Sequence, residues 1–444
     1  MGTMRNKKNI LIVFLSVMLV LSSFIIYSGA YKGFATGRDK TITIGLFSDS
    51  YWEVQNGYSY RVTDDAASLF EEQNPGIKVE YTSGILKEDY SEWLSGQLLS
   101  ENAPDVFYVL ADDFNNFAEI GALADLSPFI ENDPDFNKEA FYSSAYAYGQ
   151  YNGSQYGLPY ECAPKLMFVN KSILDKEGLK VPDKEWTWDD FYSICEKVTK
   201  DTDGNGTIDQ FGVIGYTWEE AFESEGIKLF GEKGAKCYFT DDKIGKALTF
   251  IERLESINNK YNADSKDFDL GNVVFQPMSF SNYRAYKPYP LKVKKYTNFE
   301  WECIPMPAGP DGGNISTLDT LLIAMNKKCR NKSAAWDLIK TLTYNTKIQS
   351  EIFDYSEGVS VLKEVTESEQ ALGQLVNGNS FSLEVLSNAV EEAVVVPGFR
   401  YYDEAVTEVS RAVEAIIDGG YNISTGQIIW NRKINKYLKN SRGK

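Results

Sequence analysis

Residues 201–212, DTDGNGTIDQFG, space oxygen-bearing groups as the loop of an EF-hand calcium site does. The loop positions that ligate the ion are matched by Asp201, Asp203, Asn205, the backbone carbonyl of Thr207, and Asp209. Gly206 suits the sharp turn, but Gly212 stands where the bidentate glutamate should be. We therefore expect either a structural calcium ion that takes a ligand from elsewhere, or an Asx-rich turn without a metal. No other cofactor is expected.

The sequence contains no histidine, which excludes His-dependent triads, His-ligated metals and the usual general base at neutral pH. Ser360–Lys363 has the S-x-x-K spacing of serine acyl enzymes but lacks their partner motifs. The glycines at 226 and 231 have P-loop spacing, but Glu232 follows them and would repel phosphate. These absences favour a binding protein over an enzyme.

Adjacent carboxylates remain as candidate acid and base groups. Asp112 with Asp113, and Glu219 with Glu220, could cleave a glycoside, because that chemistry needs only two carboxyls. Their separation is not set by sequence, and solvated surface is the default for acids in so acidic a chain. An exported glycan-cleaving enzyme therefore stays an alternative hypothesis.

The composition describes a large acidic globular protein. The 444 residues include 43% hydrophobic and 14% aromatic residues, enough for two or three domains. A net charge of −18 would repel nucleic acid and anionic lipid, so we expect no nucleic-acid partner. The five cysteines lie far apart without a C-x-x-C pair, and we expect buried apolar thiols rather than disulfides or a zinc site. They are Cys162, Cys195, Cys237, Cys303 and Cys329.

The N-terminus has the pattern of an export signal. Basic residues at 5, 7 and 8 precede an apolar run over residues 10–27. Small residues at 28–30 and 33–35 offer cleavage sites, yet the run is also long enough to span a bilayer. Residues 1–40 are thus predicted to be a signal peptide or a membrane anchor, and the rest to lie outside the cytoplasm.

The elements that must position these residues alternate between strand and helix. Strands at 41–47, 77–81 and 106–110 alternate with helices at 61–73, 90–99 and 114–121. This β-α-β order predicts an open, mostly parallel sheet, in which ligands bind outside the carboxyl ends of the strands. Beyond residue 200, strands at 211–216 and 301–305 and a helix at 243–259 predict a second lobe. Helices at 404–417 and 425–438 close the chain.

Residues 156–198 predict a crossing between the two lobes. A strand at 166–169 is followed by Asn170-Lys171-Ser172, and Thr187 can cap a helix over 188–200. This stretch resembles family 1 of the extracellular solute-binding proteins, the sugar receptors of bacterial ABC importers. The matching residues are Gly157, Leu158, Pro159, Val169 (usually tyrosine), Asn170, Lys171, Gly178, Leu179, Pro182 and residues 186–190. Further similar stretches lie at 104–114, 211–216, 306–313 and 331–343.

The resemblance implies a type II periplasmic-binding-protein fold with two interleaved α/β lobes joined by hinge crossings. Residues 41–160 with 316–362 would form the N-lobe, and residues 161–315 with 363–444 the C-lobe. The implied function is carbohydrate binding, with an oligosaccharide as the expected ligand, and delivery to the transmembrane permease of an ABC importer. Many members of the family end the export segment with a cysteine that receives lipid, but no cysteine precedes Cys162 here. We expect a monomer; a receptor for a membrane sensor is the other hypothesis of the same fold.

Sugar recognition needs aromatic faces against the C–H face of a ring, and carboxylates, amides or arginine for its hydroxyls. The predicted binding residues lie after strands or at the crossing, where the resemblance also implies a cleft. They are Asp49, Tyr51, Trp52, Asp112, Asp113, Tyr160, Glu161, Trp218, Tyr283, Arg284 and Asp319.

Overall fold

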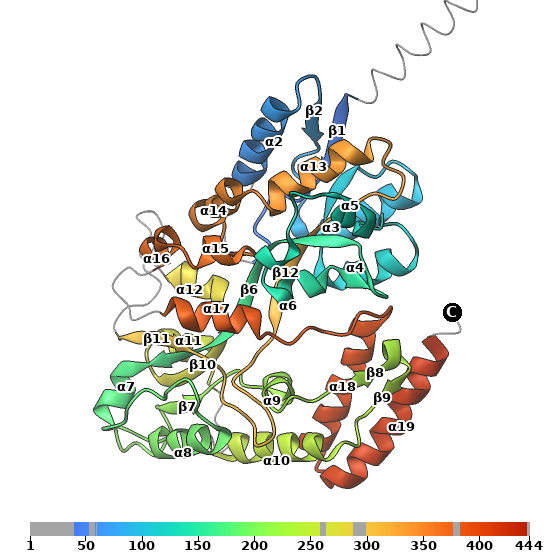
Figure 1. The fold of residues 1–444 in the computed structure, drawn as a ribbon. Coiled ribbons are helices and arrows are strands. Elements are labelled where there is room, and N and C mark those ends of the chain that lie inside the picture. Colours follow the sequence, from blue (N-terminus) through green and yellow to red (C-terminus); the bar gives the residue numbers. More distant parts are fainter. Residues whose placement is uncertain are drawn as a thin grey trace, which may run out of the picture.

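Strand β6 (Gly157–Asn170) is the axis of the computed structural model, which describes residues 40–52, 58, 60–257, 263–286, 299–375 and 382–441. Four other strands pair with β6, all of them antiparallel: β10, β11, β12 and β13. Because β6 is 14 residues long, its two ends lie in different halves of the molecule (Figure 1). The predicted export segment lies outside the described residues.

We name the two halves as they lie in Figure 1. The upper half contains β1 (Thr41–Gly45), α2 (Arg61–Gln73), β2 (Lys78–Tyr81), α3 (Lys87–Leu99), β3 (Val106–Val109), α4 (Ala111–Glu119), α5 (Ser127–Asn132), α6 (Ser143–Tyr148), β12 (Leu318–Met325), α13 (Lys332–Thr343) and α14 (Thr346–Tyr355). The lower half contains α7 (Lys171–Lys176), α8 (Trp188–Val198), β7 (Phe211–Val213), α9 (Trp218–Ser224), α10 (Asp242–Ile257), β10 (Val273–Ser279), β11 (Trp301–Ile304), α18 (Tyr402–Ile417) and α19 (Ile423–Ser441).

Shorter elements complete the described chain. They are β4 (Gln150–Tyr151), β5 (Ser154–Gln155), β8 (Phe230–Gly231), β9 (Lys236–Cys237), α11 (Ser265–Asp269), α12 (Phe280–Tyr286), β13 (Val359–Ser360), α15 (Lys363–Thr366), α16 (Glu369–Leu375) and α17 (Leu383–Glu391). None of the helices in the described ranges combines the length and the apolar character that a membrane crossing requires.

One nine-stranded sheet runs through both halves, in the order β2-β1-β3-β12-β6-β10-β7 with β11 and β13 also on β6. The predicted β-α-β order is confirmed, since β1 pairs in parallel with β2 and with β3. The prediction of a mostly parallel sheet is wrong. Strand β12 returns from the lower half and inserts antiparallel between β3 and β6, and every pair that β6 makes is antiparallel.

Local signals set the starts of α8 and α9, and the start of α8 is the one that the sequence predicts. Thr187 caps α8 through a capping box with Asp190, and α9 begins with the same device, in which Thr217 pairs with Glu220. Each box satisfies two backbone N–H groups that would otherwise lack a partner, so it fixes the first helical residue. For α9 that residue is Trp218.

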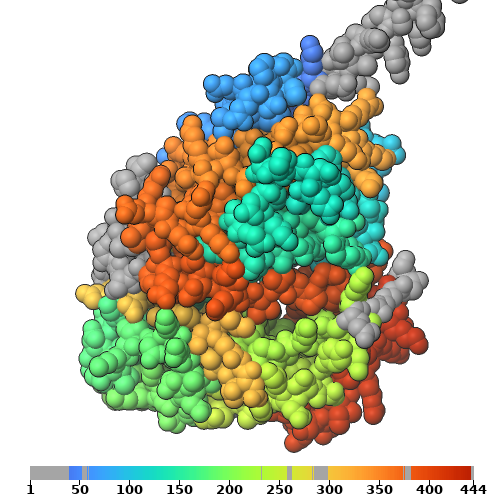
Figure 2. All heavy atoms as spheres, viewed as in Figure 1, coloured from blue at the N-terminus to red at the C-terminus, as the bar shows by residue number. Residues whose placement is uncertain are grey.

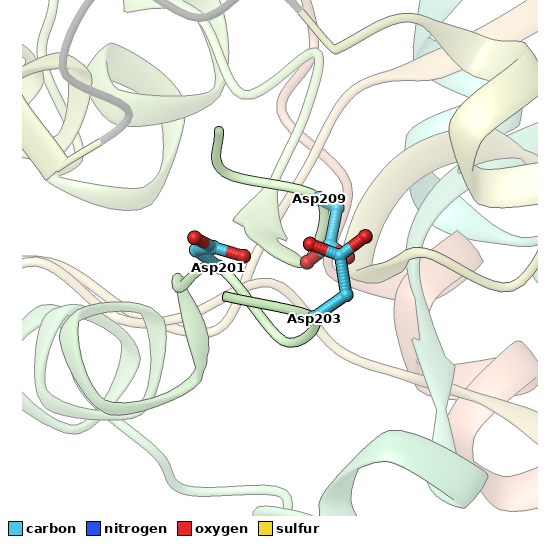
Figure 3. Close-up of side chains that lie close together, drawn as sticks. All are labelled: Asp201, Asp203 and Asp209. Carbon is cyan, nitrogen blue, oxygen red and sulfur yellow. The ribbon is translucent and has the colours of Figure 1, made fainter. Parts of the chain in front are cut away.

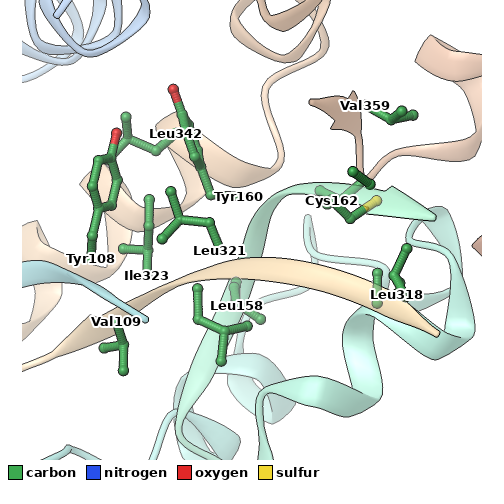
Figure 4. Packing of buried hydrophobic residues seen from close by; sticks show 14 of the residues in the cluster. Tyr108, Val109, Leu158, Tyr160, Cys162, Leu318, Leu321, Ile323, Leu342 and Val359 are labelled. Carbon is green, nitrogen blue, oxygen red and sulfur yellow. The ribbon is translucent and has the colours of Figure 1, made fainter. Parts of the chain in front are cut away.

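Two clusters of buried side chains form the core. The first extends over the sheet of the upper half and includes Tyr108, Leu158 and Ile323 (Figure 4). The second lies in the lower half between α8, α10, α18 and α19. Side chains alternate along β6, so Leu166 and Phe168 join the first cluster while Met167 and Val169 join the second. The strand is therefore packed into both cores.

The predicted lobe boundaries stay a prediction. Residues between 365 and 393, which we assign to the C-lobe, contribute Val365, Leu386 and Val390 to the first cluster. In the same region Ser144 of α6 donates a hydrogen bond to the carbonyl of Val390. Helices α15 to α17 therefore pack with the upper half. All five cysteines are buried and free, as expected for apolar thiols.

Candidate ligand-binding site

A cavity of about 550 Å³ lies between the two halves beside β6 and β12. In the space-filling view, the chain around and after α17 forms an orange-red band between the teal upper half and the green lower half (Figure 2). The part of this band that lines the cavity is residues 394–398. A hollow of about 670 Å³ between α8, α10 and α19 is lined only by the lower half, so it cannot close between the halves.

Three of the predicted binding residues line this cavity, and they come from different elements. Asp112 lies in the first turn of α4, directly after β3, and Asp319 lies in β12. Trp218 is the first residue of α9 and packs edge-on against Phe222, with 5.0 Å between ring centroids. Asp112 and Trp218 thus follow the carboxyl ends of β3 and β7, where the topology predicts a ligand.

Tyr51 borders the same acidic wall from the upper half. Its pKa is raised by burial and then by the negative charges of Asp319 and Asp112. The Tyr51 ring meets Trp52 edge-on at 4.6 Å, and Lys87 lies 4.9 Å from its centroid. Tyr51 therefore joins the large cavity to the residues described next.

A small hollow of about 40 Å³ holds Asp49, Tyr51, Tyr160 and Glu161. It is far too small for a sugar ring. Tyr160 is 5% exposed and stacks on Tyr108 at 5.2 Å, so its ring faces are covered by core. Asp49 is exposed and accepts a hydrogen bond from the backbone N–H of Lys87 at 2.8 Å. The structure therefore places these residues beside the large cavity, not around it.

Glu161 and Trp52 form a buried polar contact behind that hollow. Burial raises the pKa of Glu161 to about 7, although Ser356 donates a hydrogen bond to its carboxylate at 2.5 Å. The indole nitrogen of Trp52 has no aligned hydrogen-bond partner among the described residues. A Cβ on Gly358 would lie 2.4 Å from the Glu161 carboxylate and 2.8 Å from that nitrogen, so both groups lie against this glycine.

Asp113 and Arg284 are not brought to the cavity. Asp113 turns towards α3 and accepts a hydrogen bond from Ser91 at 2.6 Å. Arg284 donates to the carbonyls of Phe353 at 2.5 Å and Gly358 at 2.7 Å, so it connects α12 to the end of α14. The side chain of Tyr283 lies outside the described part of the structure. Asp112 and Asp113 thus face different surroundings and do not form an acid and base pair.

Sequence reasoning missed an ionic pair at one wall of the cavity. Lys165 of β6 lies 2.6 Å from Glu220 of α9, and Glu220 is 3% exposed. Burial would raise the pKa of Glu220, but the charge and hydrogen bond of Lys165 hold it below its ordinary value. A lysine within an apolar strand was the signal available in the sequence. Glu220 is thus a buried ion-pair partner and not solvated surface.

Further cavity residues, none of them predicted from the sequence as a binding residue, lie on α6, α9 and α18. They are Tyr148, Glu219, Glu223, Tyr402 and Asp403. Burial raises the pKa of Glu223 to about 8 despite the opposing charge of Lys165, and the nearby Glu220 and Glu219 raise it further. Burial and then Asp112 raise the pKa of Asp403 to about 6. Glu219 and Glu223 lie one helical turn apart, so they share a face of α9.

The predicted calcium loop brings Asp201, Asp203 and Asp209 together, with one oxygen of each within 4.8 Å of the others (Figure 3). The same carboxylates also organise a turn. Asp201 accepts backbone hydrogen bonds from Gly204 at 2.7 Å and Gly206 at 2.5 Å, which lower its pKa. Three carboxylates suit a hard cation, but they are fewer than the six to eight oxygens that calcium prefers.

The missing glutamate of that loop has a steric cause. A Cβ on Gly212 would lie 2.5 Å from the Cα of Cys195 in α8. No side chain fits at this position, so water or another group would have to complete the coordination. The three carboxylates therefore supply only part of the coordination that a calcium ion needs.

A cavity between two halves of an α/β protein that one long strand connects is the architecture of proteins that bind a small ligand between two lobes. The chain matches the bacterial extracellular solute-binding proteins over residues 52–345. It therefore belongs to that family. The resemblance stated from the sequence is confirmed, and so is its class, a binding protein and not an enzyme.

The relatives support the same fold and class. The arabinooligosaccharide-binding protein of Bacillus subtilis is 27% identical over 263 residues, which are 57% of this chain and 55% of the relative. The chain thus spans about half the length of that curated relative. The cyclic alpha-maltosyl-1,6-maltose binding protein of Arthrobacter globiformis has a similar structure, with a TM-score of 0.75 and 16% identity over 90% of this chain and 99% of that one. The sugar-binding protein MalE of Xanthomonas citri gives a TM-score of 0.74 and 17% identity over 90% and 98%. The predicted fold class is confirmed.

Proposed function

We propose that this chain is the substrate-binding protein of an ABC importer and takes an oligosaccharide into the cavity between its halves. The observation that carries the proposal is the roughly 550 Å³ cavity, whose walls combine Trp218 with carboxylates from both halves. This volume lies within the range of small-molecule sites and exceeds the size of a single sugar ring. The named relatives that bind oligosaccharides support the same class of ligand.

In the proposed binding mode, the indole of Trp218 packs against the C–H face of a sugar ring. Asp112 and Asp319 accept hydrogen bonds from hydroxyls on one side of the ligand, and Glu219 accepts them on the other. Contacts from both halves form together only when the halves approach. Ligand therefore shifts the protein towards its closed form.

The closed form would be read by the transmembrane permease, with uptake driven by a separate ATPase. The protein would work on the outer side of the membrane, which agrees with the extracellular family to which it belongs. Residues 1–40 would serve as a cleaved signal peptide or as a membrane anchor, and the protein would act as a monomer. The closed form would equally serve a membrane sensor, which is the alternative partner.

The carbohydrate part of the proposal is tested by measuring affinity with Trp218→Ala. Isothermal titration with arabino- and malto-oligosaccharides should show saturable binding by the wild type and a loss of about tenfold to hundredfold in the variant. The matched control is Trp430→Ala, because Trp430 is also half-buried but lies on α19 beside Lys433, away from the cavity. Equal losses in both variants, or release of new reducing ends from the sugar, would contradict the proposal.

We also propose that the loop at 201–209 binds calcium as a structural ion. The support is the oxygen-only cluster of Asp201, Asp203 and Asp209. Such an ion would hold the loop that leads into β7 without taking part in ligand chemistry. Its role is confined to stability.

Calcium titration of the wild type should give saturable heat and a higher melting temperature, because an ion that binds only the folded state stabilises it. Asp203→Ala should abolish both effects, while Asp311→Ala, at an exposed aspartate elsewhere, should leave them intact. If neither calcium nor a chelator changes the melting temperature of the wild type, the loop is an Asx turn without a metal.

A further inference from the structure

Helix α19 differs in charge from the rest of the molecule. After Asp418 the sequence contains no acidic residue, and these last 26 residues carry six cations. Without those six charges, the net charge of −18 becomes −24 for the rest of the chain. Four of the cations lie on α19, and these are Arg432, Lys433, Lys436 and Lys439. The negative charge that opposes contact with anionic surfaces elsewhere on the protein is therefore reversed on this helix.

Three of these cations form one exposed row, which we call the cationic stripe. Arg432, Lys436 and Lys439 are spaced by four and then three residues, so they lie one above the other on the same side of the helix. All three are exposed, and no side-chain hydrogen bond or ion pair to another described residue involves them. Their charges are therefore not compensated within the described part of the chain.

The opposite side of α19 is packed against the lower half. Its neighbours there are α10, α18 and β9. A Cβ on Gly426 would lie 2.5 Å from the side chain of Ile416 in α18, so the two helices are in close contact. The buried residues of α19 are Gly426, Gln427, Ile434 and Leu438. Because these contacts fix the rotation of the helix, the cationic stripe faces away from α18 and towards solvent, at the outer edge of the lower half (Figure 1).

Exposed apolar side chains continue the cationic stripe towards the start of the helix. Ile428 and Ile429 are 50% and 39% exposed and lie one turn before Arg432. At the flank, the ammonium of Lys433 lies 3.9 Å from the centroid of the Trp430 ring. Isoleucines beside cations suit the boundary of a bilayer, where anionic headgroups and acyl chains lie next to each other. A free anion such as phosphate would use only the cations, so the stripe favours a lipid surface.

We propose that α19 binds the surface of a membrane that contains anionic phospholipid. Arg432, Lys436 and Lys439 contact the phosphate groups of the lipid, and Ile428 and Ile429 enter the boundary beneath the headgroups. Three cations and two isoleucines give weak, reversible binding, because the electrostatic attraction falls off within a Debye length of the surface. This contact keeps an exported receptor beside the membrane in which its permease lies. The inference goes beyond the proposed function and does not depend on the ligand of the cavity.

The test places a fluorescent dye on this face of the full-length protein. Thr425→Cys lies on the exposed side of α19, one turn before the isoleucines, and can be labelled selectively because all five native cysteines are buried. The labelled protein is mixed with phosphatidylcholine vesicles that contain or lack phosphatidylglycerol. With phosphatidylglycerol, the emission of the dye should shift to the blue and be quenched by brominated lipid, and added salt should reverse both changes. The same dye at Leu270→Cys, an exposed site beside α11, should not respond.

A charge variant identifies the cations that respond to the lipid. Replacing the residues of the cationic stripe together, as Arg432→Gln, Lys436→Gln and Lys439→Gln, should remove most of the dye response. The matched control removes one arginine and two lysines from exposed positions after β12, as Lys327→Gln, Lys328→Gln and Arg330→Gln, and should keep the response.

Two results would overturn the inference. If both triple variants lose the response equally, the net charge of the protein and not α19 is the cause. If the dye on α19 gives the same signal with and without phosphatidylglycerol, the helix does not bind anionic lipid, and its cations are left for an acidic protein partner.

Discussion

At the scale of single residues, Glu161 is a carboxyl group whose buried surroundings favour its protonated, neutral form. It lies within β6, is 4% exposed and faces Ser356, Trp52, Glu357 and Arg284. Burial dominates these neighbours and raises the pKa to about 7, from an ordinary value of 4.5. The folded protein therefore binds a proton that the unfolded chain has already lost between these two values.

That difference predicts a decrease in stability as pH rises. Between about pH 4.5 and about pH 7 the folded state holds more protons, so the free energy of unfolding falls with increasing pH, and the penalty is complete above the folded pKa. Glu161→Gln removes this titration, so its stability relative to the wild type should rise by on the order of 1 to 3 kcal/mol between about pH 4.5 and about pH 7. Urea denaturation at several pH values measures the difference. A constant difference at every pH would contradict the raised pKa.

The sequence predicted which types of residue would bind a ligand, but it could not predict which side chains point into the cavity. Asp112 and Asp113 are adjacent in sequence, yet α4 turns about 100° between them, so one lines the cavity and the other bonds Ser91 of α3. The sequence could place both at the start of a helix but could not set the rotation of that helix about its axis. Likewise, Lys165 and Glu220 are 55 residues apart, and only the packing of α9 against β6 brings them together.

At the scale of elements, glycines set how closely α8 can approach the strand that follows the acidic loop. Gly212 in β7 lies against the backbone of Cys195, which is 1% exposed. The close approach requires a residue without a side chain. Gly96 in the middle of α3 has no atom within 4 Å of the Cβ position, so nothing there requires glycine.

The two glycines should respond in opposite ways to the same change. Gly212→Ala forces backbone atoms apart and should lower the free energy of unfolding by about 2 kcal/mol or more. Gly96→Ala should raise it by about 0.5 to 1 kcal/mol, because alanine favours a helix over glycine. Chemical denaturation of both variants gives the comparison. If Gly212→Ala is as stable as the wild type, α8 can move away from the added methyl group with no loss in the free energy of unfolding.

The start of α8 was predicted at the observed residue, whereas most of the central strand was missed. The Thr187 capping box is a local signal, and the structure shows it at the predicted residue. In contrast, only residues 166–169 of β6 were predicted as strand, while it begins at Gly157. Pro159, Glu161, Pro164 and Lys165 are poor strand formers, and pairing with β12 and β10 overrides their local preference.

At the scale of the whole molecule, the halves are interleaved by chain order. Strand β12 lies between β3 and β6 in the sheet although more than 140 residues separate it from the end of β6 in the sequence. Sequence could predict two lobes from the repeated strand and helix pattern. It could not predict that their sheets would be continuous through β6, because that depends on pairings between distant segments.

Strand β12 is synthesised late, so the sheet cannot be completed early in synthesis. Until about residue 325 has been synthesised, β3 and β6 have no strand between them, and the sheet of the upper half has open edges. The first third of the protein therefore has no finished structure to adopt while the ribosome is still working on the rest. The sheet is complete only after β13 (Val359–Ser360) has been made, at about four-fifths of the chain. A chain whose sheet closes so late suits a secretion channel that takes unfolded polypeptide.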